Sequence, residues 1–137
     1  MYLEFYNLRI KPFQINTDHR FLWLGGKHKE ALHYFSEALR INPNFAKAHF
    51  GVGRSFQKQG QLGKAVDHFS QAVQIQPDFY EAYYGLGNAL REQNKIDEAI
   101  GYFRTALQLK PDYAEAHLNL GDALAKQGKT EQAIDHY

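Results

Sequence analysis

The 137-residue sequence predicts an all-α fold, a solenoid built from antiparallel helix hairpins. The prediction rests first on a 34-residue period, which separates Pro43, Pro77 and Pro111. Other residue classes keep the same step, in the series Gly53, Gly87 and Gly121; Ala31, Ala65, Ala99 and Ala133; Ala38, Ala72 and Ala106; and Phe35, Phe69, Phe103 and Tyr137. Because independent residue types share one period, each period is interpreted as one unit that stacks on its neighbours to bury a common core.

The unit at residues 78–111 shows why each period predicts two helices. Asp78 and Glu81 have the Asp-x-x-Glu spacing of a capping box, which predicts a helix start. The polar stretch 92–95 ends this first helix, and Pro111 marks the end of a second one. Apolar and small residues recur at helical spacing in both, namely Tyr83, Leu86, Gly87, Leu90, Ile96, Ala99, Ile100, Phe103, Ala106 and Leu107.

Glycines inside the first helices need a structural reason, because glycine in a helix costs about 1 kcal/mol relative to alanine. We expect Gly53 and Gly87 to permit close approach of the second helix through Ala65 and Ala99. The aromatic residue at the next turn is then expected to fill the space toward the following hairpin.

The order of small and large positions in each period resembles that of the tetratricopeptide repeat. This order is aromatic or His, Leu/Val, Gly, Leu/Phe, Ala, Phe/Tyr, Ala, Pro. Residues 44–77 and 78–111 match it in full, 112–137 match until the chain stops in a second helix, and 27–43 resemble the second helix of an earlier copy. The resemblance implies a right-handed α-solenoid of about three repeats after a non-repeating segment. His49, Tyr83 and His117 stand where the family often has Trp, which predicts more polar packing there.

Residues 1–26 are rich in aromatic side chains and do not repeat. The first 32 residues resemble the N-terminal part of ATPases related to general secretion pathway component A. The resemblance lies at residues 5–8, 11–13, 18–24 and 28–32. The phosphate-binding loop of those proteins does not follow here. A second interpretation, that the aromatics cover the open end of the stack, is favoured.

Composition excludes several classes of protein. The 16 basic and 15 acidic side chains nearly cancel, which argues against a nucleic-acid partner, and the absence of cysteine excludes disulfides and thiolate metal sites. No apolar run approaches the roughly 20 residues that span a bilayer, and no signal-peptide pattern opens the chain. We therefore expect a cytoplasmic protein without membrane insertion.

Catalytic and cofactor motifs are incomplete. The glycine pairs Gly51/Gly53 and Gly85/Gly87 lack the third glycine of a dinucleotide loop and lie in predicted helices. The seven histidines include no His-Glu-x-x-His pattern, and four of them occupy corresponding repeat positions, in the pairs His49/His117 and His68/His136. We predict no enzyme activity, no cofactor and no metal.

The resemblance implies a binding groove, because the first helices of successive repeats line a concave surface in that family. The corresponding positions are Lys47, Phe50, Arg54, Gln57, Glu81, Tyr84, Asn88, Arg91, Glu115, Leu118 and Asp122. Each could instead be part of a solvated helix face. Phe50, Tyr84 and Leu118 stand one place after a core position and are expected to point outward, where a peptide would contact them.

These observations favour a scaffold or adaptor that binds a protein or peptide in the groove. The family's clamp for two carboxylates is incomplete, since only its asparagine positions recur, at Asn88 and Asn119, which favours a ligand of mixed polarity. Two alternatives stay open. One is a scaffold that self-assembles as a homo-oligomer through unfinished repeat ends, and the other is a non-catalytic repeat arm of a larger enzyme.

Overall fold

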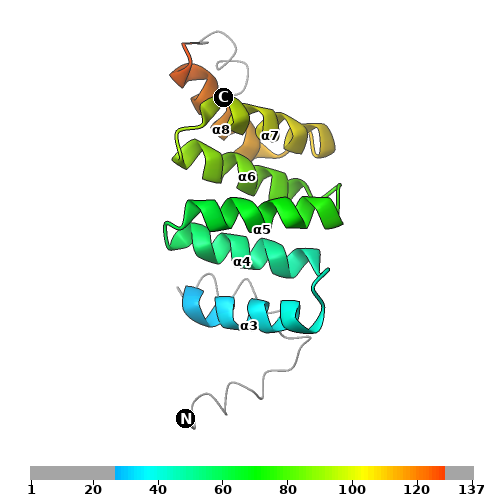
Figure 1. The fold of residues 1–137 in the computed structure, drawn as a ribbon. Helices are drawn as coiled ribbons and strands as arrows, with labels where there is room; N and C mark the ends of the chain where they lie inside the picture. Colours follow the sequence, from blue (N-terminus) through cyan, green and yellow to red (C-terminus); the bar gives the residue numbers. More distant parts are fainter. Residues whose placement is uncertain (1–26, 129–137) are drawn as a thin grey trace.

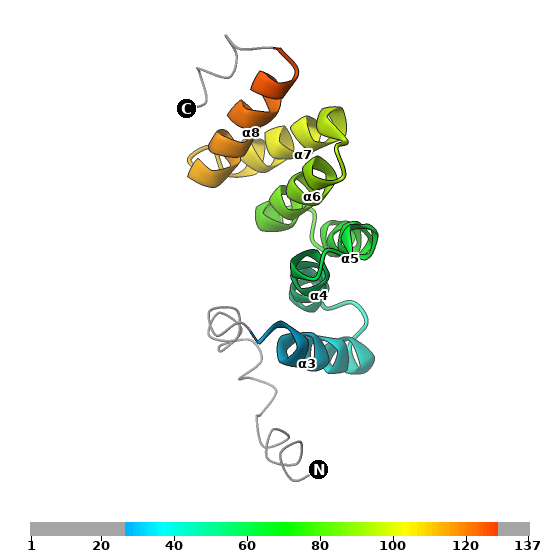
Figure 2. The same cartoon turned by 90° about the vertical axis from the view of Figure 1, so that its left-hand side faces the viewer.

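The computed structural model describes residues 27–128, which form α-helices and no strand. The helices stack in chain order as antiparallel hairpins, and α4, α6 and α8 succeed one another along one side of the stack (Figure 1, Figure 2). Their bounds are α3 His28–Ile41, α4 Ala46–Lys58, α5 Leu62–Ile75, α6 Tyr80–Glu92, α7 Ile96–Leu109 and α8 Ala114–Lys126. The predicted all-α solenoid is thereby confirmed. No helix in this range is long and apolar enough to cross a membrane.

The ends of the second helices follow the prolines, but the starts of the first helices do not follow the predicted capping box. Helices α3, α5 and α7 each end two residues before Pro43, Pro77 or Pro111. Helix α6, however, begins at Tyr80 after an N-cap Phe79 that makes no side-chain cap hydrogen bond. The capping-box prediction for Asp78 and Glu81 is wrong because the helix begins two residues after Asp78, where a backbone bond from Ala82 N–H to Phe79 O (3.1 Å) closes its first turn.

The turn inside each hairpin requires a left-handed residue. The φ angles are 77° at Gly60, 64° at Asn94 and 78° at Gly128, three positions that keep the 34-residue step. Glycine adopts this conformation without steric cost, and asparagine tolerates it better than most residues. The turn therefore recurs with the same backbone geometry although one of its three residues carries a side chain.

The glycines of the first helices meet aromatic rings rather than alanines. A Cβ atom added at Gly53 of α4 would lie 2.8 Å from the Phe69 ring, and one at Gly85 of α6 would lie 2.9 Å from the same ring. Phe69 is fully buried. At Gly87 of α6, the three nearest atoms belong to Phe103, the first at 2.5 Å. The predicted glycine–alanine contact is corrected to a glycine–phenylalanine contact, in which one ring of the second helix is held between two first helices.

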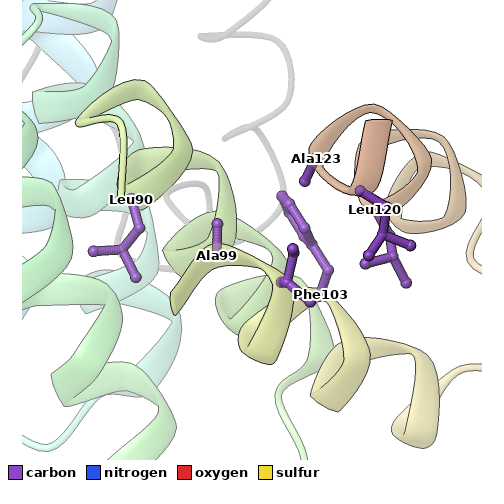
Figure 3. Packing of buried hydrophobic residues seen from close by; sticks show 7 residues of the cluster. Leu90, Ala99, Phe103, Leu120 and Ala123 are labelled. Carbon is purple, nitrogen blue, oxygen red and sulfur yellow. The ribbon is translucent and has the colours of Figure 1, made fainter. Parts of the chain in front are cut away.

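The buried cluster at the C-terminal end of the described range joins three helices. Figure 3 shows Phe103 between Ala99 of its own helix and Leu120 and Ala123 of α8, with Leu90 contributed by α6. These residues are almost completely buried. Neither hairpin would bury this surface alone, so the stability of each repeat depends on the next.

Two of the three positions expected to pack in a more polar way, His49 and His117, do so, whereas the third, Tyr83, stacks on Tyr102. His49 of α4 is 5% exposed, and its Nε2 atom lies 2.9 Å from the Pro43 carbonyl oxygen, to which it donates. Its Nδ1 atom lies 3.2 Å from Nδ1 of His68 in α5, whose ring stacks on Phe56. His117 makes the same contact with Pro111 O at 2.8 Å. Burial, and then His49, lower the pKa of His68 below its ordinary value of 6.5.

Gly87→Leu is predicted to lower the free energy of unfolding by about 1–3 kcal/mol, because the new side chain would overlap the Phe103 ring. Urea denaturation measures this. The matched control is Gly101→Leu in α7, where an added Cβ meets nothing within 4 Å. The control should be neutral or stabilising, by up to about 1 kcal/mol from helix propensity. Equal stability of the two variants would contradict the glycine–phenylalanine contact.

The His49–His68 pair predicts a loss of stability in mild acid. Because the folded pKa of His68 is lowered, the unfolded chain binds more protons just below pH 6.5, so stability rises with pH through that window and falls as pH drops. We expect thermal unfolding at about pH 5 to occur at lower temperature than at about pH 7.5. The difference should shrink in His68→Phe, which keeps a ring beside Phe56. A substitution at the exposed His33 controls for the loss of one imidazole. An unchanged pH dependence in His68→Phe would refute the assignment of the effect to His68.

Candidate functional site

A hollow of about 740 Å³ lies between α4, α6 and the start of α8, and we call it the groove cavity. Its lining consists of Phe50, Arg54, Gln57, Lys58, Glu81, Tyr84, Gly85, Asn88, Glu92, Tyr113 and Glu115. Seven of the eleven positions predicted for the groove are thus brought together. The other four, Lys47, Arg91, Leu118 and Asp122, lie on the same three helices but outside the lining.

Aromatic residues form the floor of the groove cavity. The Phe50 ring packs against Phe69 and Phe79, with centroids 5.7 and 5.0 Å away. Tyr84 repeats this arrangement 34 residues later, against Phe103 (5.9 Å) and Tyr113 (5.0 Å).

The expectation that Phe50 and Tyr84 point outward holds only in part, since both residues line the cavity but their rings also pack against the core. Both rings are half-buried, because an aromatic residue 29 positions further along, Phe79 or Tyr113, packs against each. Leu118, the third residue of this row, is 51% exposed, as expected. The aromatic row is partly a packing element and offers a ligand only its remaining exposed surface.

Hydrogen bonds tie the walls of the cavity together. Asn119 Nδ2 of α8 donates to Tyr84 Oη and to Asn88 Oδ1, both at 2.8 Å. Arg91 Nη2 also donates to Asn88 Oδ1, at 3.4 Å. Across the α4–α6 boundary, Gln57 Nε2 donates to a Glu92 carboxylate oxygen at 2.7 Å. These bonds hold the lining side chains in place before any ligand arrives.

The side-chain amide of Asn88 uses its oxygen, but not its nitrogen, in hydrogen bonds to other described residues. Within residues 27–128 this nitrogen donates to no protein atom, whereas Asn88 Oδ1 accepts two hydrogen bonds. Its N–H groups are thus available in the cavity lining to a carbonyl or carboxylate oxygen.

Two side chains in the lining, Arg54 and Tyr113, have pKa values shifted from their ordinary ones. Burial lowers the pKa of the Arg54 guanidinium, while the Tyr113 and Tyr84 hydroxyls act in the opposite direction. The guanidinium carbon lies 5.8 Å from the centroid of the Phe50 ring, over which it is placed. Burial, then Tyr84 and the carboxylates Glu115 and Glu81, raise the pKa of Tyr113 far above its ordinary value. The cavity therefore presents a partly desolvated cation beside a hydroxyl that keeps its proton.

The predicted groove positions did not include four residues of the lining: Lys58, Gly85, Glu92 and Tyr113. A signal for Tyr113 was present, because Phe45, Phe79 and Tyr113 keep the 34-residue step and form the N-caps of α4, α6 and α8. Asn119 stands where the two preceding repeats have Gly51 and Gly85. This replacement of a recurring glycine by a polar residue is the sequence signal that could identify Asn119 as a residue of the site.

Two further expectations concern parts of the chain that the structure does not describe. The resemblance of the N-terminal segment to secretion-pathway ATPases involves mainly residues 1–26, and the truncated second helix of the last repeat involves residues 129–137. Between 27 and 128, no three His, Asp or Glu side chains lie close enough together to hold a metal ion.

Comparison with known proteins agrees with the fold. The family model of the TPR repeat matches residues 53–90 and 87–128, and a second model, of the tetratricopeptide repeat, matches residues 20–45. Comparison with the curated protein sequences gave no match.

Solved structures with the same fold include the crystal structure of MamA, with a TM-score of 0.77 and 24% identity over 87% of this chain and 70% of that one. MamA from Desulfovibrio magneticus RS-1 has a TM-score of 0.80 and 24% identity, over 92% and 71% of the two chains. A mutant O-GlcNAc transferase from Thermobaculum terrenum has a TM-score of 0.79 and 26% identity, over 82% of this chain but only 22% of its own.

The family match carries more weight than these structural similarities, which show the fold. The TPR-repeat model accounts for residues 53–128, more than half of the 137-residue chain. Its two matches run across three of the first helices and the hairpins between them. The chain belongs to the tetratricopeptide-repeat family.

Proposed function

We propose that this chain is a protein-interaction scaffold that binds an extended segment of a partner protein in the groove cavity. The observation that carries the proposal is the lining itself, in which aromatic surface and polar groups from three successive first helices meet around about 740 Å³. Cavities of this size accommodate several side chains. Because the lining comes from three helices, a bound segment would run along the stack.

The lining offers the two kinds of contact that an extended segment needs. The exposed parts of Phe50, Tyr84 and Tyr113 supply apolar surface for side chains, and aromatic anchors carry much of the free energy in protein interfaces. The Asn88 amide N–H groups and the Arg54 guanidinium supply donors for carbonyl or carboxylate oxygens. Hydrogen bonds that already hold the walls reduce the ordering that binding requires.

The same groove would serve if the repeats belonged to a larger enzyme. The similarity to an O-GlcNAc transferase covers only 22% of that chain. In that case the cavity would position a protein substrate and take no part in bond breaking, so absence of catalysis in these repeats remains our expectation.

A decisive substitution must leave the fold intact. Changing Tyr84, Asn88 and Arg91 together to alanine would also remove the ring that packs on Phe103 and the oxygen that accepts from Asn119. A bulky label in the cavity is a cleaner perturbation. The chain has no native cysteine, and Glu115 is an exposed residue of the lining, so Glu115→Cys can be labelled selectively with fluorescein maleimide.

Peptides selected on the wild-type chain from a random phage-displayed library are predicted to bind labelled Glu115→Cys at least about tenfold more weakly, since the label occupies their site. Fluorescence or calorimetric titration measures the dissociation constants. The matched control is Gln74→Cys with the same label, on an exposed position of α5. Full binding to labelled Glu115→Cys, with loss in labelled Gln74→Cys, would overturn the groove proposal.

Self-association is a second candidate, favoured by the 51% exposure of Leu118 on α8. An exposed leucine in a row otherwise packed by aromatics is a candidate contact between chains. We expect sedimentation at increasing concentration to reveal dimers or larger species, and Leu118→Lys to shift them toward monomer. Leu109→Lys, at a 41% exposed leucine of α7, should have no such effect. A monomeric wild-type profile over the whole range would eliminate this candidate.

A further inference from the structure

The charged side chains that line the groove cavity are sorted by helix. Both cations, Arg54 and Lys58, come from α4. All three carboxylates, Glu81, Glu92 and Glu115, come from α6 and α8. The cavity therefore has one basic wall and one acidic wall, although the chain as a whole is nearly neutral.

The same polarity appears along two of the rows that connect equivalent positions of successive repeats, whereas a third, from Lys58 to Glu92 to Lys126, is positive again on α8. One row changes from Lys47 to Glu81 to Glu115. A second changes from Arg54 to Asn88 to Asp122. Helix α4 contains no acidic residue, so the basic character of its wall is not offset within the helix. Two of the rows on the first helices thus pass from positive on α4 to negative on α8.

Packing does not explain this arrangement. None of the five charged lining residues is fully buried, and the residues that pack the helices together are mainly glycine, alanine, aliphatic and aromatic. Charged residues at other surface positions of a repeat would serve folding and solubility equally well. Arg54 and Glu92 also make contacts within the protein, with Phe50 and Gln57, but all five charged residues border the cavity, where a ligand can reach them.

The two walls differ in their local electrostatic field. Burial and Tyr84 raise the pKa of Tyr113 most, and the carboxylates Glu115 and Glu81 raise it further, which places negative charge on this side of the cavity. On the opposite wall the Arg54 guanidinium is stacked over Phe50 and is partly withdrawn from water. Charges in such a hollow are screened less by salt than fully exposed ones. A ligand would encounter opposite potentials within the span of one cavity.

From this arrangement we propose that the segment bound in the groove cavity carries two charge blocks, an acidic block against the α4 wall and a basic block against the α6–α8 wall, joined by apolar residues over Phe50, Tyr84 and Tyr113. This inference rests on the proposed groove function. A uniformly acidic segment would be repelled by Glu81, Glu92 and Glu115, and a uniformly basic one by Arg54 and Lys58. The walls thus select against single-sign ligands as well as for the two-block pattern.

The probe is a set of synthetic peptides of equal length with a common apolar centre, and the first two have identical composition. One has an acidic half and a basic half, and another has the same charges in alternation. All-acidic and all-basic peptides of equal length complete the set. Fluorescence anisotropy with the full chain at low salt should give about fivefold or tighter binding of the two-block peptide over the alternating one. The preference should diminish as salt is added.

Variants of each wall test the assignment. Lys58→Glu combined with Arg54→Gln removes the basic wall and should shift the preference to the all-basic peptide. Glu81→Gln combined with Glu115→Lys removes most of the acidic wall and should shift it to the all-acidic peptide. Lys64→Glu makes the same charge change at an exposed residue of α5 outside the cavity, and should leave the two-block preference intact. Circular dichroism and thermal unfolding verify each fold, and Lys58→Glu alone replaces the first pair if that pair unfolds.

Equal affinity for the two-block and alternating peptides would overturn this inference, as would a preference that survives in both wall variants. If a fluorescein label at Glu115→Cys blocks library-selected peptides but charge order has no effect, only the two-block inference fails. If the label has no effect either, the groove function fails with it.

Discussion

The stack depends on the close approach of two first helices to one phenylalanine ring. Phe69 of α5 is held between Gly53 of its own hairpin and Gly85 of the next, and a Cβ atom at either glycine would lie less than 3 Å from the ring. No side chain larger than hydrogen fits both sides without displacement. This contact sets the spacing between α4 and α6, and the distance between these helices fixes the width of the groove cavity that they line.

The junction between α6 and α8 is built differently. Asn119 stands at the position of Gly85, where the preceding repeat has no room for a side chain. Its amide nitrogen donates to Tyr84 Oη and to Asn88 Oδ1, so it bonds α8 to α6. The exchange of a glycine contact for two hydrogen bonds gives this junction a polar edge. That edge lies at the groove cavity, so the same substitution shapes both packing and site.

The sequence allowed prediction of those features that recur with the period. Hairpins, helix ends before prolines and most groove positions follow from a 34-residue step, because equivalent residues occupy equivalent places in a stack. Features that depend on contacts between different positions of the period were missed or wrong. Phe50 and Tyr84 were expected to face solvent, but Phe79 and Tyr113 pack against them from the next repeat. Which of the eleven groove positions line one cavity depends on the spacing and twist of α4, α6 and α8, which no local pattern specifies.

Positions that repeat along the chain serve folding, and positions that vary from repeat to repeat are the ones available for recognition. Gly53 and Gly87 are fixed by a steric limit, since a carbon added at either would lie less than 3 Å from the ring of Phe69 or Phe103. The charged residues at the groove positions are subject to no such limit, and along two rows their sign changes, from Lys47 to Glu81 and from Arg54 to Asp122. A repeat that kept one sign at every groove position would bind single-sign ligands and be less selective among them. Opposite walls restrict the ligand by repulsion as well as attraction, and they do so without altering any contact on which the stack depends.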